Sequence, residues 1–323
     1  MNKKLLSAIA VAIVPTAVFF AGPRPNKTVT TQRIDVPANL DEYLRQQESA
    51  IGDVFEGFQK QIHWYSSKGE KTKISLVYLH GFSASRHEVS PLVESLGDSL
   101  GANIFFTRLK GHGRPGRAMA EATVNDWIND GLEAIEIGRR IGDQVVIVAN
   151  STGATISTWL MAHPELSGDV AAHVIMSPNF GPKDGTARVL LWPWGGKIAE
   201  FLQGKERSWE PHNELHGRYW TTSYPTSTLV DMMGLVDLVD ETDLSPMEVP
   251  TLSVYSPKDA VVDPARIEEA FLKFGSRHKM LVPFDKSEDP SSHILAGDIM
   301  SGSTTEDVKQ IILSFLGDVG LGT

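Results

Sequence analysis

Short runs of apolar residues alternate along the chain with longer segments in which apolar residues recur every three or four positions. The short runs are continuous and are bounded by polar or turn-forming residues, a pattern typical of strands that are buried on both faces. They lie at Ile74–Leu79, Ala102–Thr107, Val145–Ala149, Val174–Met176, Thr251–Tyr255 and Met280–Val282. A further short strand is expected at Gln61–Tyr65. The runs therefore predict a buried, mostly parallel sheet.

The segments between these runs have the periodicity of helices. In residues 124–141 the apolar positions fall on one helical stripe, and Thr123 and Asp126 are placed to form an N-terminal capping box. Further helices are expected at Asp41–Glu48, 89–100, 152–162, 265–274 and 305–316. Alternating strands and helices predict the α/β class, with a doubly wound sheet flanked by helices.

One long stretch, residues 181–249, interrupts this alternation between two predicted strands. It contains four of the seven tryptophans. Because a structureless loop of that length is rare in a compact domain, we expect an inserted helical cap. Its aromatic residues either line an apolar substrate pocket or pack the cap onto the sheet. The core then comprises residues 61–180 and 250–317, preceded by an extension, a linker and a helix at 26–60.

The N-terminus carries a targeting pattern. Lys3 and Lys4 precede residues 5–21, which are almost wholly apolar, so residues 1–25 predict a signal peptide or a retained membrane anchor. Bulky Phe19 stands where a cleavage site after Ala21 would need a small residue, and the choice between the two stays open. Burial of this segment as a helix is the third reading. We expect an exported protein, periplasmic or extracellular, that a retained segment would anchor to the inner membrane.

Composition excludes several classes of chemistry. The chain has 40 acidic and 30 basic residues and a formal charge of −10, which argues against nucleic-acid binding. It has no cysteine, so thiol nucleophiles and cysteine-bound metals are excluded. No nucleotide-binding glycine motif follows the first strand, so no cofactor is expected. Between His212 and His216 the glutamate does not directly follow the first histidine, as the zincin motif requires, and no metal site is predicted.

The clearest chemical motif is the sequence VVIVANSTG at residues 145–153, where a predicted strand runs directly into a turn and a helix. This is the setting of a nucleophile elbow, in which a strained turn exposes a serine hydroxyl above the sheet. Ser151 occupies the nucleophile position. The small residues that such a turn requires are Ala149 and Gly153, giving A-x-S-x-G in place of G-x-S-x-G. The alternative is that Ser151 only caps the following helix.

A second strand ends in His80-Gly81-Phe82, a sequence suited to an oxyanion hole. Gly81 allows the chain to bend so that the backbone N–H of Phe82 points at a substrate oxygen. The N–H of Thr152, which follows the elbow serine, would be the second donor. The position of His80 before the glycine favours a structural hydrogen bond over a role as catalytic base.

Five motifs in order, HGFSAS, RLKGHG, ANSTG, SPKDAVVDP and SSHILAG, resemble those of the α/β-hydrolase family. The chain is most similar to the branch of monoacylglycerol lipases and carboxylesterases, over about residues 60–317 apart from the cap. This resemblance implies a serine hydrolase that cleaves small or lipid-like carboxylic esters through an acyl-enzyme. The same fold and triad also serve amide, thioester and carbon–carbon cleavage, and a non-catalytic envelope binding protein that has kept the fold is the further alternative.

The resemblance also implies the partners of Ser151. The family places its acid after a late strand, where Asp259 and Asp263 stand. Asp259 is favoured, because Asp263 precedes Pro264 and a helical run and is explained as a helix N-cap. His293 follows the last strand and is the expected base, so the chain order is serine, aspartate, histidine. His112, in the second of the five motifs, is expected to be structural.

Overall fold

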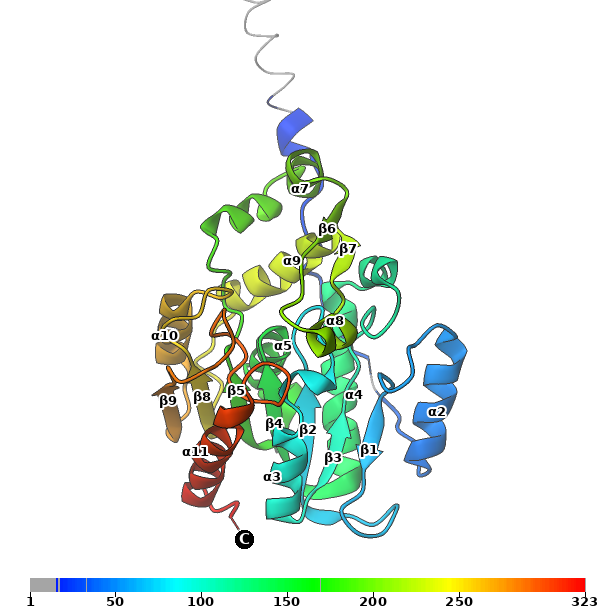
Figure 1. Ribbon diagram of the computed structural model, residues 1–323, viewed down its shortest axis with the longest axis vertical. Coiled ribbons are helices and arrows are strands. Elements are labelled where there is room, and N and C mark those ends of the chain that lie inside the picture. Colours follow the sequence, from blue (N-terminus) through cyan, green and yellow to red (C-terminus); the bar gives the residue numbers. More distant parts are fainter. Residues whose placement is uncertain (1–15, 17, 33, 169, 323) are drawn as a thin grey trace, which may run out of the picture.

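A seven-stranded sheet forms the centre of the computed structural model, which describes residue 16 and residues 18–32, 34–168 and 170–322 (Figure 1). The strand order is β1-β3-β2-β4-β5-β8-β9. Every neighbouring pair is parallel except β1–β3, which is antiparallel. The strands are β1 (Gln61–His63), β2 (Thr72–Leu79), β3 (Asn103–Phe106), β4 (Gly142–Asn150), β5 (Val170–Met176), β8 (Thr251–Tyr255) and β9 (Lys279–Pro283). The mostly parallel sheet predicted from the apolar runs is confirmed.

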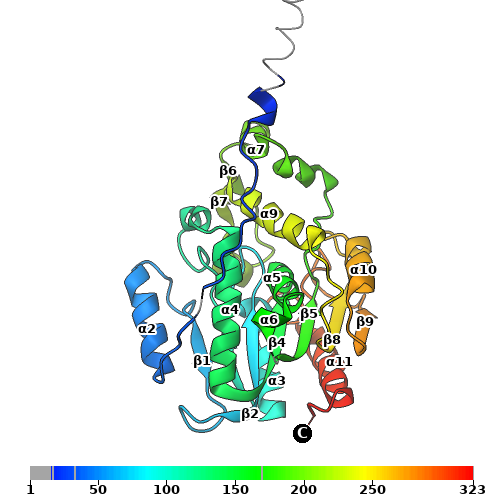
Figure 2. The same ribbon diagram turned by 180° about the vertical axis from the view of Figure 1, so that it is seen from behind.

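Helices cover both faces of the sheet, and each face has its own apolar core (Figures 1 and 2). One face carries α2 (Leu40–Ile51), α4 (Val124–Ile141), α5 (Thr152–Met161) and α10 (Pro264–Lys273). The other carries α3 (Leu92–Leu100) and α11 (Thr305–Asp318). Burial on both sides explains why the strands are continuous apolar runs.

The capping box predicted for α4 is present. The Asp126 backbone N–H donates to the Thr123 hydroxyl at 3.2 Å, and the Thr123 N–H donates to the Asp126 carboxylate at 3.0 Å. These two bonds satisfy amide groups that have no partner within the helix, and they fix where α4 begins.

Residues 181–249 form several short elements between β5 and β8, at one end of the sheet (Figure 1). They are η3 (Gly185–Leu191), α7 (Gly195–Gln203), β6 (Glu206–Ser208), α8 (Glu214–Tyr219), β7 (Ser223–Pro225) and α9 (Thr228–Glu241). Strands β6 and β7 pair antiparallel, a feature that the expected all-helical cap did not include. Three-residue strands are too short to show the alternation that predicts them.

The predicted targeting segment lies largely outside the described residues, which leave out 1–15 and 17. Its described end, residues 18–22, lies beside α7 in both views (Figures 1 and 2). There the backbone N–H of Trp194 donates to the carbonyl of Pro23 at 2.9 Å. Among the residues that the structure describes, no helix is both long and apolar enough to cross a bilayer.

Candidate active site

Ser151 is the single residue that connects β4 to α5, at the carboxyl edge of the sheet. Strand β4 ends at Asn150 and α5 begins at Thr152, so one residue makes the whole turn. Ser151 has φ 49° and ψ −116°, a conformation that residues with a side chain rarely adopt. Its N–H donates to the Met176 carbonyl of β5 at 3.0 Å, which holds the strained turn against the sheet.

The small residues of the elbow are required by close backbone contacts. A Cβ atom added at Gly153 would lie 2.2 Å from the carbonyl oxygen of Leu79 and 2.7 Å from that of His80. Since both neighbours are backbone atoms at the end of β2, no side-chain movement would relieve the overlap. Ala149, on the other side of the serine, is fully buried. The elbow therefore packs directly on the strand that leads into the His80-Gly81-Phe82 loop.

The structure brings Ser151, His293 and Asp259 together in one hydrogen-bonded chain. The Ser151 Oγ and the His293 Nε2 are 3.0 Å apart, and the His293 Nδ1 and the Asp259 Oδ2 are 2.8 Å apart. Because a carboxylate only accepts, Nδ1 carries the proton and Nε2 is free to accept from the serine hydroxyl. Backbone N–H groups of Val261 and Val262 donate to the Asp259 Oδ1 at 2.8 and 2.9 Å, so this carboxylate is held on both sides.

Burial and charge act in opposite directions on His293. Burial alone would lower the pKa of its imidazole, but the hydrogen bond and the charge of Asp259 outweigh it, helped by the charges of Asp289 and Glu88, and the net effect raises the pKa above 6.5. The imidazole is therefore a stronger proton acceptor than free histidine. It is neutral, and able to accept a proton, on the alkaline side of this raised pKa.

Asp289 holds the loop that carries His293. Its carboxylate accepts three backbone N–H bonds, from Ser291 at 3.0 Å and from His293 and Ile294 at 2.9 Å each. The hydroxyl of Ser177 also donates to the His293 carbonyl at 2.6 Å. Sequence reasoning assigned no such role to Asp289, although an aspartate before Pro290 is a recognisable turn signal.

Asp263, the rival acid, lies at the start of α10. Its carboxylate accepts from the N–H of Ala265 at 3.3 Å, with Pro264 in the first turn. The interpretation of Asp263 as a helix N-cap is confirmed, and the hydrogen bond to the histidine ring is made by Asp259.

The His80-Gly81-Phe82 loop lies against the elbow. A Cβ atom on Gly81 would be 3.0 Å from the Glu88 Oε2 and 3.2 Å from the Ser151 Cβ, so a side chain there would displace both neighbours by a few tenths of an ångström. Among the hydrogen bonds of the described residues, none engages the backbone N–H of Phe82 or of Thr152. Both N–H groups are thus free to donate to a ligand.

The ring of His80 is fully engaged in positioning that loop. Its Nε2 accepts from the Leu109 N–H at 3.1 Å, and its Nδ1 donates to the Gly81 carbonyl at 2.9 Å. Burial lowers its pKa to about 4. The ring of His112 is likewise buried, and its Nε2 accepts from the Ser83 N–H at 3.0 Å. Both imidazoles are therefore uncharged at neutral pH, and both support the loop through hydrogen bonds of their ring nitrogens.

Glu88 is a buried carboxylate beneath the site that sequence reasoning missed. Its Oε1 accepts from the Tyr78 hydroxyl at 2.7 Å and from the Gly81 N–H at 2.6 Å, and its Oε2 accepts from the Asn150 amide at 3.0 Å. One side chain thus links β2, the loop and the residue before Ser151. Burial raises its pKa, the three hydrogen bonds partly oppose this, and the result is about 7. A single acidic residue in a short 3-10 turn has no pattern that would reveal such a role.

The remaining histidine pair of the sequence, His212 and His216, lies in the cap. The backbone N–H of His212 donates to the Nδ1 of His216 at 3.2 Å, and the two rings stack 5.5 Å apart. Within the described part of the chain, no cluster of three potential metal ligands occurs.

The cap touches the site on two sides of Ser151. On one side, the Thr221 N–H donates to the Ser83 carbonyl at 2.7 Å, and the rings of Phe82 and Tyr224 meet edge to face at 5.4 Å. On the other, the cap is linked to Ser151 through Asn179 of the core, whose N–H donates to the Ser151 carbonyl and whose amide reaches the sulfur of Met232 on α9. The cap therefore bridges the loop and the elbow, and aromatic side chains lie on the loop side.

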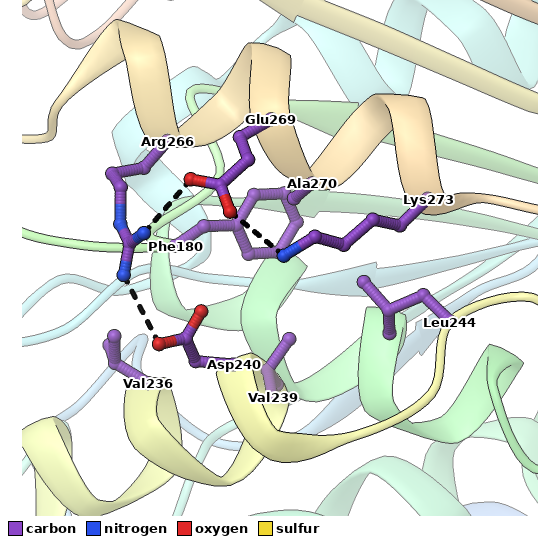
Figure 3. Close-up of a pocket in the computed structure, with 9 residues that line it drawn as sticks. All are labelled: Phe180, Val236, Val239, Asp240, Leu244, Arg266, Glu269, Ala270 and Lys273. Carbon is purple, nitrogen blue, oxygen red and sulfur yellow. Dashed lines mark hydrogen bonds and ion pairs between the residues drawn. The ribbon is translucent and has the colours of Figure 1, made fainter.

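A small cavity marks the seam between the cap and the core, where α9 meets α10 (Figure 3). Arg266 bonds to Asp240 of α9 at 3.1 Å and to Glu269 of its own helix at 2.9 Å. The cavity has a volume of about 20 Å³, room for a water molecule but not for an organic substrate. None of the nine residues drawn around it belongs to the hydrogen-bonded chain of Ser151, so we interpret it as a packing seam.

Comparisons with known proteins agree with this architecture. The model of the family described as serine aminopeptidase, S33, matches residues 70–287. A solved structure described with the metagenome-derived lipolytic enzymes LipS and LipT is similar with a TM-score of 0.64 and 18% identity, covering 82% of this chain and 99% of that one. No curated protein matches the chain in sequence.

Two monoglyceride lipases are also similar. A soluble variant of the Saccharomyces cerevisiae enzyme, in complex with a substrate analogue, has a TM-score of 0.60 and 13% identity, covering 91% of this chain and 99% of that one. The monoacylglycerol lipase of Paleococcus ferrophilus has a TM-score of 0.57 and 13% identity, covering 79% and 98%. At these identities the similarity establishes the fold.

Proposed function

The chain belongs to the serine aminopeptidase S33 family of α/β hydrolases, and from this premise we propose that it is a serine hydrolase that cleaves carboxylic esters. One observation carries the proposal: Ser151, in a strained strand-to-helix turn, is joined through His293 to the buried carboxylate of Asp259. A serine whose only task is to cap a helix does not need this arrangement. Nucleophile, base and orienting acid together are the parts of acyl transfer.

The proposed reaction begins with the transfer of one proton. His293 accepts the hydroxyl proton of Ser151 at Nε2 while the serine oxygen bonds to the ester carbonyl carbon. The carbonyl π pair moves onto oxygen, which becomes an oxyanion. Asp259 keeps the proton of Nδ1 in place and stabilises the imidazolium that forms.

Two backbone donors would stabilise the oxyanion, the N–H of Phe82 and that of Thr152. When the tetrahedral intermediate collapses, the alkoxide leaves with the proton from His293, and an acyl group stays on Ser151. Water then attacks this ester, His293 again serves as base, and the acid product leaves with Ser151 restored. The chemistry uses only groups of the chain and water.

Lipid-like esters, acylglycerols among them, are the substrates that we propose. Support comes from the cap, where the buried ring of Trp220 packs with Ala84, beside the loop, and with Ile294, beside the base. Apolar side chains thus border the site on the cap side. Monoglyceride lipases are among the proteins of similar fold.

Amide cleavage is the second candidate, because the family takes its description from a serine aminopeptidase. The same Ser151 acyl-enzyme would form, with an amine in place of the alcohol as leaving group. Nitrophenyl esters of two to sixteen carbons, assayed beside aminoacyl nitroanilides, separate the two bonds.

The proposed nucleophile is tested by hydrolysis of a nitrophenyl ester by the wild type, Ser151→Ala and Ser99→Ala. Removing a triad nucleophile costs about three decades or more of rate. Ser99 lies on α3, where its hydroxyl donates to the Ser95 carbonyl, so its variant should keep full activity. Equal turnover by the wild type and Ser151→Ala would reject the mechanism and favour a binding protein that has kept the fold.

We also propose that the chain is exported, on the lysines and the apolar residues of positions 1–25 alone. Cell fractionation with an N-terminal sequence of the recovered protein tests this. A protein that starts at Met1 in the membrane fraction indicates an anchor, and one that starts after residue 21 in a soluble exported fraction indicates cleavage. Recovery in the cytoplasm contradicts both.

A further inference from the structure

Large apolar side chains gather on the surface at the outer end of the cap. Of the fourteen large hydrophobic residues that are exposed in the described part of the chain, seven belong to this group. Phe201 is 87% exposed, Leu202 68%, Phe20 64% and Trp192 56%. We call this surface the cap tip and define it as Val18, Phe19, Phe20, Trp192, Trp194, Phe201 and Leu202. Scattered exposed apolar residues need no explanation, but a group of this size marks an interaction surface.

Two distant parts of the sequence build the cap tip, and they are fastened together. The indole N–H of Trp194 donates to the Val18 carbonyl at 3.1 Å, and its backbone N–H donates to the Pro23 carbonyl. A Cβ atom on Gly22 would overlap the Trp194 ring at 2.2 Å, so the two segments are in tight contact. Trp194 itself has φ 63°, a conformation that costs energy for a bulky residue. The N-terminal segment and the start of α7 therefore form one unit.

Helix α7 leaves two of its apolar residues on the surface. It packs on the cap through Ala199, which joins a buried cluster with Leu190, Met233 and Val236. Its last turn then leaves Phe201 and Leu202 outside that cluster. Burial of such side chains is favourable by itself, so their exposure indicates a partner that covers them.

The N-terminal segment that leads into the cap tip indicates which kind of partner covers this surface. Residues 5–21 are almost wholly apolar, and their described end, Phe19 and Phe20, is part of the cap tip. A bilayer that takes up residues 5–21 would meet the tryptophans and α7 at the same place. Tryptophan is enriched at the level of lipid headgroups, where its ring is apolar and its N–H is polar.

The charge of the surrounding segment fits the same partner. Residues 188–207 contain four basic residues and two acidic ones, in a chain whose formal charge is −10. Basic residues beside an apolar surface favour membranes that contain anionic lipids.

We propose that the cap tip is a membrane-docking surface, which inserts its aromatic and aliphatic side chains into the headgroup region of an anionic bilayer. Docking here directs α7 toward the membrane and places the C-terminal end of α11 at the far end of the molecule (Figures 1 and 2). The proposal adds a second lipid contact to residues 5–21, and it does not depend on the reaction at Ser151.

The test uses the full chain with vesicles of phosphatidylglycerol and phosphatidylcholine, and with vesicles of phosphatidylcholine alone. The variant Phe201→Ser/Leu202→Ser removes the most exposed apolar side chains of α7. The matched control is Leu272→Ser on α10, which is 79% exposed and lies outside the cap tip. We expect tighter binding to the anionic vesicles, at least a tenfold fall in the partition coefficient for the double variant, and no change for the control.

Contact with lipid is read directly by tryptophan fluorescence with brominated lipids, which quench only neighbouring indoles. Wild-type emission should be quenched on binding, and less so in Trp192→Phe, which keeps an aromatic ring at the same place. Thermal unfolding at the wild-type temperature shows that each variant is folded.

Three results would overturn the proposal. The first is a bound protein whose tryptophans brominated lipids do not quench, because residues 5–21 would then bind without the cap tip. The second is equal partitioning of the double variant and the wild type. The third is a dimer in lipid-free sedimentation that the double variant abolishes while vesicle binding is unchanged, which would assign this face to contact between copies.

Discussion

Replacement of Asp289 with asparagine perturbs the loop that carries His293 and leaves the three side chains of the proposed triad unchanged. The Asp289 carboxylate accepts from three backbone N–H groups, two on one oxygen and one on the other. Asparagine has nearly the same shape but a single acceptor oxygen and an NH₂ group. With its oxygen turned toward His293 and Ile294, the NH₂ group would face the N–H of Ser291, donor against donor.

The size of the expected loss in kcat/KM follows from the hydrogen bonds that asparagine cannot make. A hydrogen bond to a charged group contributes about 1.5–3 kcal/mol, and asparagine loses one such bond and the charge on the other two. We expect the arrangement of the loop to lose about 2–4 kcal/mol. Since about 1.4 kcal/mol corresponds to a factor of ten in rate, kcat/KM for a soluble ester should fall by about one and a half to three orders of magnitude. The loss should appear mainly in kcat, because the base is misplaced while the cap is intact.

Asp285 provides the matched control. It lies four residues earlier, its side chain is 65% exposed, and its contact is with Lys258 at 3.5 Å. An exposed pair of this kind contributes little, so Asp285→Asn should keep wild-type kinetics and thermal unfolding. The two variants are compared in hydrolysis of nitrophenyl acetate and in thermal unfolding. Wild-type kcat/KM in Asp289→Asn would refute the view that this carboxylate positions His293.

Three further predictions follow from single contacts. The acid limb of the pH profile of kcat/KM should lie above pH 6.5, because activity needs neutral His293 and the pKa of this imidazole is raised. Glu88→Gln removes one of the charges that raise this pKa, so the acid limb should move to lower pH in that variant. The carboxyl of Glu88 has a pKa of about 7 in the folded protein and an ordinary value of 4.5, so its contribution to stability is complete below pH 4.5 and is lost as the pH rises through 7. The unfolding temperature should therefore decline less over this pH range in Glu88→Gln than in the wild type, and parallel curves would contradict this. Gly153→Ala places a methyl group 2.2 Å from the Leu79 carbonyl and should lower the free energy of unfolding by several kcal/mol, whereas Gly185→Ala, with open space around it, should be neutral in urea titrations.

Most of the core was predictable because its elements follow simple periodicities. Helix α4 begins and ends where the apolar stripe and Thr123 place it, and β8 coincides with the run Thr251–Tyr255. Strand β5 begins four residues before the predicted run, at Val170, because small residues in its first half hide the apolar pattern. The order of the motifs was enough to pair Ser151, Asp259 and His293.

The supporting residues were not predictable because they act through individual contacts that leave no periodic pattern in the sequence. Glu88 stabilises the loop through bonds to residues 7, 10 and 62 positions away, and no local pattern records such pairings. The β6–β7 hairpin is too short to show alternation. The cap tip was not expected either, since exposure of Phe201 and Leu202 depends on which face of α7 packs on the cap.

The central claim is that Ser151 is the nucleophile of an acyl-transfer reaction, and covalent labelling of the folded full chain tests it most directly. A fluorophosphonate probe should give one adduct, located on Ser151 by peptide mass spectrometry, and labelling should slow by orders of magnitude in His293→Ala. Absence of an adduct on Ser151 in folded protein, or ester hydrolysis that persists in Ser151→Ala, would contradict the account.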